Sequence, residues 1–430
     1  NCQFWILRGG GGIKEYIANL VNHLEQVDHE NEYVLYVLED QFENAKAKLP
    51  ARFKLKAIPY RRNPVSRIMR SLFAQSFWSR EEQEEGFDVF HSPFFHAPKM
   101  KKARVVMTVH DLRLYRYPET YPFLRYQFLK RAVKKSIERV DKIIAISQFT
   151  KDEMIDTCGV NPDKVTVIHE AINRSFFCAD AIANYSPPQE YAYLKGCRFL
   201  FCLSQIEPRK NHARLIKAFS AIKAMDGYDD LKLVLAGQQL LNVGPVLKLI
   251  AETKDVVYLD YVPTEMMLWL YQNASLFVYP SYYEGFGFPP LEAASLGTVS
   301  AVGNVSSVPE VCGDSAFYFD PYDVDDMSQV IATALSNEAL IKEKKTKLET
   351  QLGKFSWEKN AKETVKVYIE TPDEKDGFHN ATCWLPENRW EKIIGYTDKE
   401  ILLLKKIVNS NADLIIEFSQ KGGFLNAANL

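Results

Sequence analysis

Short apolar segments alternate with longer amphipathic segments along most of the chain, and this alternating series occurs twice. In the first half the predicted strands are residues 33–37, 89–91, 105–109, 142–146 and 165–168, and the predicted helices are residues 14–25, 126–140 and 150–157. In the second half the predicted strands are residues 199–203, 232–236, 256–259, 276–279, 299–301 and 316–319, and the predicted helices are residues 213–225, 246–252, 264–272, 292–296 and 325–337. Strands that alternate with helices favour a parallel sheet covered on both faces. The sequence therefore predicts an α/β protein with two successive Rossmann-like domains and a ligand site in the cleft between them, at the carboxyl ends of the strands.

A proline-containing connection at residues 180–191 separates the two series. We therefore expect an N-terminal domain at residues 1–185 and a second domain at residues 192–350. A length of 430 residues is sufficient for two or three domains of this kind.

The last part of the chain, residues 371–430, starts with a charged linker and lies outside this pattern. It predicts a helix at residues 398–408 and a strand at residues 413–418, which are too few elements to bury a sheet. We expect it to be the start of a further α/β domain that continues beyond Leu430. The start of the chain, without methionine and with a glycine run already at residues 9–12, also predicts a fragment.

The charge and cysteine content exclude several classes of protein. The chain has 53 basic and 55 acidic residues, so no general attraction to nucleic acid is expected. Its seven cysteines show no CxxC pair and no metal-binding spacing, which is typical of reduced thiols in a cytoplasmic protein. The sequence contains neither a run of 18 apolar residues nor a signal peptide, so a cytoplasmic location is predicted.

Two basic segments bear on contact with an anionic membrane. Residues 61–80, from Arg61 to Arg80, contain five arginines, several large apolar side chains and no acidic residue. Peripheral membrane contact and a helix with its apolar face in the core explain this segment equally well. Residues 125–142 form a second basic amphipathic segment. For this second segment, a helix with its apolar face in the core explains the pattern better.

The segment Glu284-Gly-Phe-Gly-Phe-Pro-Pro-Leu-Glu292 follows a predicted buried strand and leads into a helix. Its glycines allow a tight turn, and its prolines suit the first turn of a helix, whose free N–H groups attract an anion. Because carboxylates repel phosphate, Glu284 and Glu292 are better explained as acceptors for hydroxyl groups on either side of a bound diphosphate. The structural alternative is that Glu284 is a solvated loop residue and that Glu292 is an ordinary acidic residue in the first turn of the helix, where the helix dipole favours a negative charge.

Arg209 and Lys210 lie in Glu207-Pro-Arg-Lys-Asn211, directly after the first predicted strand of the second domain. Two adjacent cations at this end of the sheet would neutralise a diphosphate, although a lone Arg-Lys pair is usually a solvated turn. The pair Asp323 and Asp325 has the DxD spacing of a metal motif, but it lies at a predicted helix start and is better explained by capping. No metal site is predicted.

These motifs resemble those of family 4 retaining nucleotide-sugar glycosyltransferases, which have the GT-B architecture of two Rossmann domains. The segment from Glu284 to Glu292 is similar to the E-x7-E signature of that family, and Arg209-Lys-Asn is similar to its R-K-N element. In the family, the first glutamate and the adjoining loop amides contact the donor sugar, and the second glutamate holds the ribose hydroxyls. The resemblance implies donor-binding roles for Gly285, Phe286, Gly287, Phe288 and Leu291. It covers residues 1–370, including a closing helix at residues 351–370 that returns to the first domain.

Further site residues follow from the same resemblance. Gly11-Gly-Ile-Lys-Glu-Tyr16 is similar to the family element G-G-I-G-R-Y, which implies donor contacts for Gly11, Gly12 and the amide of Ile13; Lys14 and Glu15 depart from it. His110 and Asp111 end a predicted strand and resemble the H-D element, whose histidine lies beside the donor sugar near the reacting carbon. The structural alternative is a histidine in the core whose hydrogen bonds are all made within the protein. His91 and Ser92 end a similar strand and are expected on the acceptor side, together with Asp111. The nucleotide base is expected near Gly237, Tyr261 and Val262.

The resemblance implies a retaining, metal-independent hexosyltransferase, with His110, Glu284, Arg209 and Lys210 as catalytic residues. The expected donor is a GDP- or UDP-linked hexose, with mannose favoured over glucose, and the expected acceptor is a glycan or a lipid-linked saccharide. No other cofactor is expected. Two alternatives stay open: a sugar-nucleotide epimerase of the same fold, and a non-catalytic nucleotide-sugar binding module. A dehydrogenase is disfavoured because the glycine run lacks G-x-G-x-x-G spacing.

Overall fold

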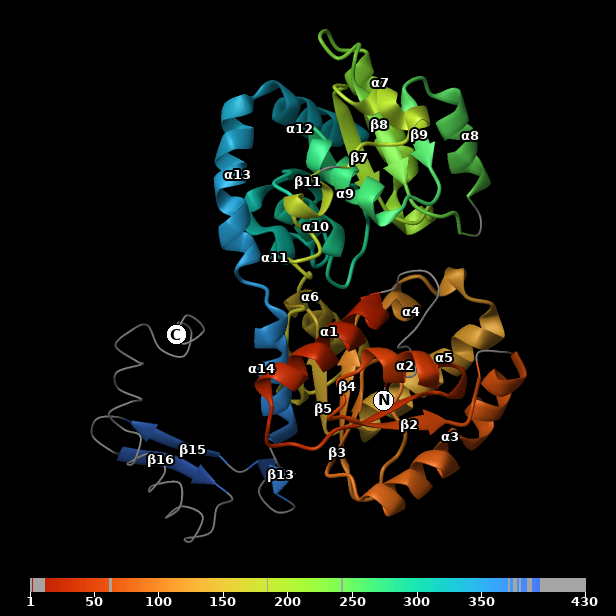
Figure 1. Ribbon diagram of the computed structural model, residues 1–430, viewed down its shortest axis with the longest axis vertical. Coiled ribbons are helices and arrows are strands. Elements are labelled where there is room, and N and C mark those ends of the chain that lie inside the picture. The colour runs from red at the N-terminus through yellow and green to blue at the C-terminus, as the bar shows by residue number, and fades with distance from the viewer. Residues whose placement is uncertain are drawn as a thin grey trace. The chain divides into compact units, whose positions relative to one another are not determined.

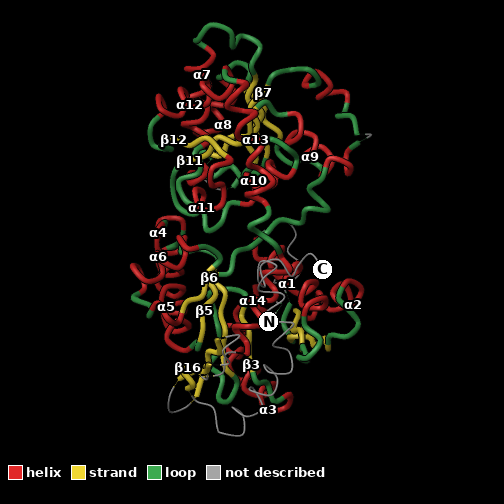
Figure 2. The backbone as a smooth tube through the Cα atoms, turned by 90° about the vertical axis from the view of Figure 1, so that its left-hand side faces the viewer, coloured by secondary structure: helices red, strands yellow, loops and turns green. Residues whose placement is uncertain are grey.

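The structure is a computed structural model that describes most of the chain. The described residues are residue 2 and residues 12–61, 64–183, 185–240, 243–369, 372–373, 377–378, 380–384 and 389–394. Residues 1–364 form one compact unit and residues 365–430 a second. Figure 1 labels the helices and strands, and Figure 2 colours the backbone by secondary structure.

The N-terminal lobe, residues 12–183, contains a four-stranded parallel sheet. Its strands are β3 (Val89–Ser92), β4 (Arg104–Val109), β5 (Lys142–Ala145) and β6 (Val165–Val167), in this order across the sheet. A separate parallel pair consists of β1 (Val34–Leu38) and β2 (Lys54–Ile58). The helices are α1 (Gly12–Val27), α2 (Phe42–Lys48), α3 (Pro64–Glu85), α4 (Arg113–Arg116), α5 (Phe123–Arg139) and α6 (Gln148–Cys158).

The C-terminal lobe, residues 185–352, contains a six-stranded parallel sheet in the order β12-β11-β10-β7-β8-β9. The strands are β7 (Phe199–Leu203), β8 (Lys232–Ala236), β9 (Val256–Leu259), β10 (Leu276–Tyr279), β11 (Ser300–Gly303) and β12 (Ala316–Phe319). The helices are α7 (His212–Lys223), α8 (Gly244–Glu252), α9 (Thr264–Asn273), α10 (Phe288–Ser295), α11 (Val308–Cys312), α12 (Val324–Ser336) and α13 (Glu338–Leu352). The predicted α/β fold with two Rossmann-like domains is therefore confirmed.

The strands of the C-terminal lobe are almost entirely apolar because both faces of this sheet are buried. Along β7, Phe199 and Phe201 join the core on one face, and Leu200 and Cys202 join the core on the other. These four side chains have no solvent exposure. The sheet is thus a rigid base for the loops that follow its strands.

Helix α14 (Trp357–Ile369) follows the C-terminal lobe. The indole ring of Trp357 lies 5.9 Å from the ring of Tyr16 in α1, so the start of α14 packs against the N-terminal lobe. In the second unit, the described residues form two antiparallel pairs: β13 (Pro372–Asp373) with β14 (Gly377–Phe378), and β15 (Asn380–Trp384) with β16 (Arg389–Ile394). The predicted elements at residues 398–408 and 413–418 lie outside the described residues, as does Gly11.

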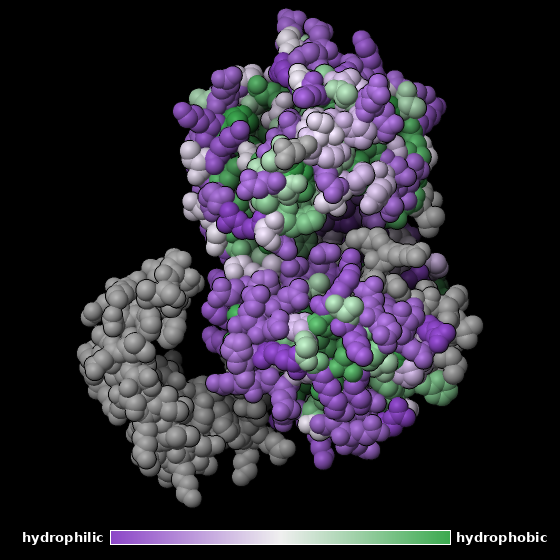
Figure 3. Space-filling model, viewed as in Figure 1, coloured by the Kyte–Doolittle hydropathy of each residue, from purple (hydrophilic) through white to green (hydrophobic). Residues whose placement is uncertain are grey.

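The surface of the described residues is largely hydrophilic on the face drawn in Figure 3. In the basic segment at residues 61–80, Phe77 and Trp78 are core side chains of α3, whereas Phe73 is exposed. Helix α5, by contrast, exposes Phe123 and Leu124 in its first turn, at 72% and 81%. None of the described helices has the length and apolar character needed to cross a membrane.

Candidate active site

The candidate site lies where the sheet of the C-terminal lobe changes direction. The chain proceeds from β7 to β8 and β9 on one side, and then returns to add β10, β11 and β12 on the other. The connections after β7 and β10 therefore leave in opposite directions, which opens a ligand position at the carboxyl ends of these two strands. Arg209 and Lys210 follow β7, and Glu284 follows β10.

The structure brings these three predicted residues into direct contact. Lys210 Nζ lies 2.6 Å from Glu284 Oε1, and Arg209 Nη1 lies 2.9 Å from Glu284 Oε2. Burial opposes ionisation of Glu284, but the charges of Lys210 and Arg209 outweigh it and lower its pKa to about 2. Glu284 is therefore ionised throughout the neutral range and fixes both cations.

A second carboxylate and a third cation extend this cluster. Glu207 is 5% exposed; it accepts from Arg209 Nη2 at 2.6 Å and from Arg113 Nη2 of α4 at 3.0 Å. The cluster of Arg113, Arg209, Lys210, Glu207 and Glu284 thus contains three cations and two carboxylates, with one net positive charge. Because the positive charge is already desolvated and ordered, an anion would gain more binding free energy from it than from a flexible surface lysine.

Hydroxyl groups from both lobes hold the glycine loop. Ser307 Oγ donates to the carbonyl oxygens of Glu284 and Phe286, at 2.9 and 2.7 Å. Ser147 Oγ, at the start of α6 in the N-terminal lobe, donates to the carbonyl oxygen of Gly285 at 2.7 Å. Three successive carbonyl groups are therefore fixed, which pre-organises the loop.

Gly285 and Gly287 are required by geometry. A Cβ atom on Gly285 would lie 1.8 Å from the His110 carbonyl oxygen and 3.1 Å from the Asp111 side chain. Gly287, the residue before α10, has φ of 109°, which disfavours any side chain. The loop can approach the strand end at His110 and Asp111 only because residue 285 has no side chain.

His110 is held between two acceptors. Its Nδ1 lies 3.1 Å from Glu170 Oε1, and its Nε2 lies 2.9 Å from the Pro93 carbonyl oxygen. Burial lowers the pKa of His110, but the hydrogen bond and charge of Glu170 outweigh burial and raise it above its ordinary value. The Tyr16 ring packs edge-on at 5.0 Å. Both ring nitrogens face acceptors, an arrangement that only the protonated imidazolium satisfies.

Glu292 lies in the second turn of α10 and is half-buried. Tyr271 Oη donates to Glu292 Oε2 at 2.6 Å. Burial raises the pKa of Glu292 to about 7 despite this hydrogen bond. Unlike Glu284, Glu292 forms no ion pair with a cation among the described residues, so its carboxyl group is suited to exchange hydrogen bonds with neutral hydroxyls.

Of the other predicted donor residues, some lie at the start of α1 and others are buried in the glycine loop and in α10. Gly12, at the start of α1, lies near the ring of Phe288, so the two glycine elements approach one another, and Ile13 is half-buried beside it. Phe286 and Leu291 are buried, which leaves only their backbone for a ligand.

The residues expected to contact the base lie at the ends of β8 and β9. Gly237 follows β8 with φ of 136°, and a Cβ there would lie 2.0 Å from the Ser204 carbonyl oxygen. Tyr261 is 72% exposed, and Val262 is half-buried against the core. Because these strands are parallel to β7, the loops open on the same edge as Lys210.

The predicted acceptor-side residues are engaged within the N-terminal lobe. His91 Nε2 lies 2.8 Å from Thr108 Oγ1, and burial lowers the pKa of His91 to about 3. Ser92 Oγ donates to the His96 carbonyl oxygen at 2.6 Å, which stabilises a turn. Asp111 accepts from the Arg113 N–H at 3.0 Å. Of these residues, only Asp111 adjoins the glycine loop.

Comparison with known proteins identifies the family. A sequence model described as glycosyltransferase family 4 matches residues 10–176, and a model described as glycosyl transferases group 1 matches residues 189–355. The chain is 30% identical over 283 residues to the O-antigen chain mannosyltransferase B of Escherichia coli, covering 65% of this chain and 74% of that protein. The chain belongs to glycosyltransferase family 4.

Other relatives of this family 4 chain are larger or more distant. It is 33% identical over 267 residues to the serotype-specific mannosyltransferase WbdA of Escherichia coli, covering 60% of this chain but only 32% of that protein. Among solved structures, HepE of Anabaena in complex with UDP and glucose superposes with a TM-score of 0.62 at 14% identity, covering 85% of this chain and 98% of that chain. WaaG, a glycosyltransferase involved in lipopolysaccharide biosynthesis, gives 0.61 at 15% identity, with coverage of 85% and 98%. These structural matches support the same fold.

The DxD string of this glycosyltransferase is a helix cap, as predicted. Asp323 Oδ1 accepts from the N–H groups of Asp325 and Asp326 at the start of α12, at 2.8 and 3.1 Å. Across the described part of the chain, no group of three or more His, Cys, Asp or Glu side chains is arranged to hold a metal ion.

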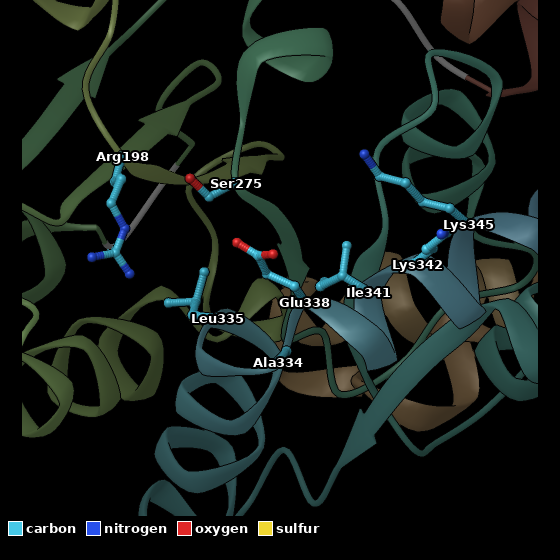
Figure 4. A pocket seen from close by; sticks show the side chains of 8 residues that line it. All are labelled: Arg198, Ser275, Ala334, Leu335, Glu338, Ile341, Lys342 and Lys345. Carbon is cyan, nitrogen blue, oxygen red and sulfur yellow. The ribbon is translucent and has the colours of Figure 1, made fainter.

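A cavity of about 410 Å³ lies at the opposite edge of the C-terminal sheet (Figure 4). It is lined by Arg198 and Ser275, which directly precede β7 and β10, and by side chains of α12 and α13. Because it is at the amino ends of the strands, it is separate from the site around Glu284.

Sequence reasoning missed several site residues that the structure reveals. Ser147 comes directly after a predicted strand, as His110 does, and Glu170 comes two residues after another, so the same strand-end rule would have found them. Glu207 was within the motif that contains Arg209, but its contact with Arg113 joins segments 94 residues apart. Such a contact carries no local sequence signal.

Proposed function

We propose that this family 4 glycosyltransferase transfers a hexose, with mannose favoured over glucose, from a GDP- or UDP-linked donor to a glycan or lipid-linked saccharide. We further propose that the anomeric configuration is retained and that no metal is needed. The relatives named as O-antigen chain and serotype-specific mannosyltransferases support mannose and a polysaccharide acceptor.

The observation that carries this proposal is the net positive cluster at the carboxyl ends of β7 and β10. When the glycosidic bond to a nucleotide diphosphate breaks, negative charge grows on the leaving oxygen. Lys210 and Arg209 are placed to stabilise this charge, and Glu284 keeps both cations in position before the donor arrives. These cations would supply the stabilisation that a metal ion provides in other enzymes.

The carboxyl groups and the histidine have separate proposed roles. Glu292 accepts hydrogen bonds from the ribose hydroxyls of the donor, and Glu284 contacts the donor sugar while it pairs with the cations. Protonated His110 lies at the strand end against which Gly285 packs, and it contacts the hexose near the reacting carbon. Glu170 maintains the charge and orientation of His110.

A direct assay tests the proposal. The chain is incubated with labelled GDP-mannose, GDP-glucose or the UDP-hexoses, with an oligomannoside acceptor, in the presence and absence of EDTA. We expect release of nucleotide and labelled glycan with EDTA present, and NMR of the product should show the anomeric configuration of the donor. Interconversion of the nucleotide sugars without transfer would indicate an epimerase, and binding without release a non-catalytic module.

Matched variants connect the activity to the cluster. Lys210→Ala should lower the rate of nucleotide release by at least about 100-fold, the usual cost of removing one group that stabilises developing charge. Lys345→Ala removes a lysine from the opposite edge of the same lobe and should leave the rate unchanged. Equal rates for the two variants would contradict the assigned role of Lys210.

We also propose peripheral membrane contact, with residues 61–80 and α5 as the contacting segments. Phe123, Leu124 and Phe128 are exposed on α5 among basic side chains, which suits an anionic interface. Co-sedimentation with vesicles containing an anionic lipid should be lost in the Phe123→Ser, Leu124→Ser double variant. It should be kept in Phe176→Ser, which alters an exposed phenylalanine elsewhere.

A further inference from the structure

Two tyrosine rings form a stack at the surface beside the candidate site. The rings of Tyr282 and Tyr322 lie 4.7 Å apart at an angle of 15°, and Tyr322 is 59% exposed. Two hydrogen bonds fix the position of the Tyr282 ring. Its hydroxyl donates to Asn211 Oδ1 at 2.5 Å and accepts from Arg214. A rigid aromatic pair that leaves a ring face in water is a favourable surface for a ligand with an apolar face.

The stack lies on a defined side of Glu284. Tyr282 is two residues before Glu284, and Tyr322 comes shortly after β12. The sheet order places β12 on the far side of β10 from β8 and β9, where the nucleotide base is expected. The Tyr282–Tyr322 stack therefore lies on the side of the site that the donor nucleotide leaves free.

Tyr117 of the N-terminal lobe links the stack to the charge cluster. Its ring packs at 5.8 Å from Tyr283, the residue before Glu284. Burial raises the pKa of Tyr117, while Tyr322 raises it further and Arg209 lowers it, so its hydroxyl is within electrostatic range of both. Tyr117 therefore lies near both the charge cluster and the Tyr282–Tyr322 stack.

A polar pocket of about 480 Å³ adjoins the stack at the carboxyl ends of β11 and β12. Its lining includes Asn304, Val305, Asp320, Pro321 and Asp326. Pro321 is the residue before Tyr322, and Val305 precedes Ser306, whose hydroxyl accepts from the Glu284 N–H at 3.0 Å. The volume lies within the range of about 300–1,000 Å³ that is usual for ligand sites.

The chemistry of this surface fits one class of ligand. A hexopyranose presents C–H groups on one face, which pack against an aromatic ring, and hydroxyls around its edge, which carboxylate and amide oxygens accept. Asp320 and Asp326 would repel a phosphate group. The surface therefore suits a neutral saccharide.

We propose that Tyr282, Tyr322 and the adjoining pocket bind a hexopyranose unit of the glycan acceptor beyond the unit that receives the transferred sugar. The site rests on the proposed function, because an acceptor exists only if the chain transfers sugar to a glycan. Tyr322 is then a specificity residue for acceptor length, and it does not contact the donor.

The test compares acceptors of two lengths with the full chain. The KM of Tyr322→Ala for methyl α-mannotrioside should rise by about tenfold, the loss expected when one stacking ring is removed. Its KM for methyl α-mannoside, its KM for GDP-mannose and its rate of donor hydrolysis should stay at wild-type values. Tyr322→Phe keeps the ring and should behave as wild type, as should Tyr193→Ala, which removes an exposed tyrosine near the start of β7.

A binding measurement separates failure of this site from failure of the proposed function. If the wild-type chain releases no nucleotide from any donor, the proposed function fails, and saturation-transfer NMR with methyl α-mannotrioside or maltotriose still decides the site. Binding to wild type that is lost in Tyr322→Ala and kept in Tyr322→Phe would support the stack as a saccharide surface. Equal KM values for the trioside in Tyr322→Ala and wild type, or equal NMR signals, would overturn it.

Discussion

Replacing Glu284 by glutamine removes the carboxylate that holds Lys210 and Arg209, and its cost can be worked out from the structure. Burial opposes ionisation, but the two cations lower the pKa of Glu284 from 4.5 to about 2, and the residue is only 8% exposed. This difference corresponds to about 3 kcal/mol of folding free energy. The value agrees with the cost of about 3–5 kcal/mol for breaking a buried ion pair.

The sign of the pH dependence follows from the lowered pKa. A carboxyl group whose pKa is lower in the folded state stabilises the fold above its unfolded pKa of 4.5, and it loses this contribution as the pH falls toward 2. The wild type should therefore exceed Glu284→Gln in stability at neutral pH, and the difference should shrink in acid.

Thermal unfolding followed by circular dichroism measures both effects. At neutral pH the Tm of Glu284→Gln should be lower by about 6–12 °C, as expected for about 3 kcal/mol in a lobe of this size. The control is Glu343→Gln. Glu343 pairs with Lys347 at the same 2.6 Å, but both side chains are exposed, so no measurable change is expected. Equal Tm values for wild type and Glu284→Gln, or a difference that persists at low pH, would refute the reasoning.

Three further outcomes are expected. Donor affinity should rise as the pH increases through about 7, because burial raises the pKa of Glu292 to about 7 and the ionised carboxylate accepts hydrogen bonds from hydroxyl groups. Calorimetry with GDP-mannose should show this rise in the wild type and no such rise in Glu292→Gln. Gly285→Ala would place a Cβ 1.8 Å from a carbonyl oxygen and should lower kcat/KM by at least about 100-fold, whereas Gly303→Ala, with its nearest atom at 3.1 Å, should keep most activity in the same transfer assay. Glu170→Gln should lower the pKa of His110, followed by NMR, from above its ordinary value to below it, because burial then acts without the charge of Glu170. An unchanged pKa would exclude the His110–Glu170 ion pair.

The strands of the C-terminal lobe could be predicted closely because both faces of the sheet are buried. Predicted strands at residues 199–203, 232–236 and 256–259 coincide with β7, β8 and β9. Strand β2, by contrast, was not predicted. It belongs to a two-stranded pair, and Lys54 and Lys56 alternate with its apolar residues, so it has no apolar run.

Helix α13 was also missed, and the reason is physical. Of its 15 residues only Leu348, Gln351 and Leu352 are buried, so most of the helix has no apolar stripe. Its fixed position depends on tertiary packing, which leaves little trace in the local sequence.

The site could be predicted where a polar residue lies in the segment that follows a strand, as with Arg209 and Lys210 after β7 and His110 after β4. The partners of these residues could not be predicted from the sequence alone. Glu284 pairs with cations 74 and 75 residues before it, and Glu170 lies 60 residues from His110. Sequence spacing gives no information on which side chains meet after strands from different positions enter one sheet.

The hydrogen bonds of the glycine loop couple the position of Glu284 to both lobes. Ser307 in the C-terminal lobe fixes the carbonyl groups on either side of Gly285, while Ser147 and Thr150 in the N-terminal lobe donate to the Gly285 carbonyl itself. A movement between the lobes that breaks the contact with Ser147 would release Gly285 from the strand end at His110, and Glu284 is the next residue. The ionic cluster also depends on contact between the lobes, because Arg113 of the N-terminal lobe pairs with Glu207 of the C-terminal lobe. The arrangement of charges that suits a diphosphate is therefore complete only when these contacts between the lobes are made, so donor binding and lobe contact should stabilise one another.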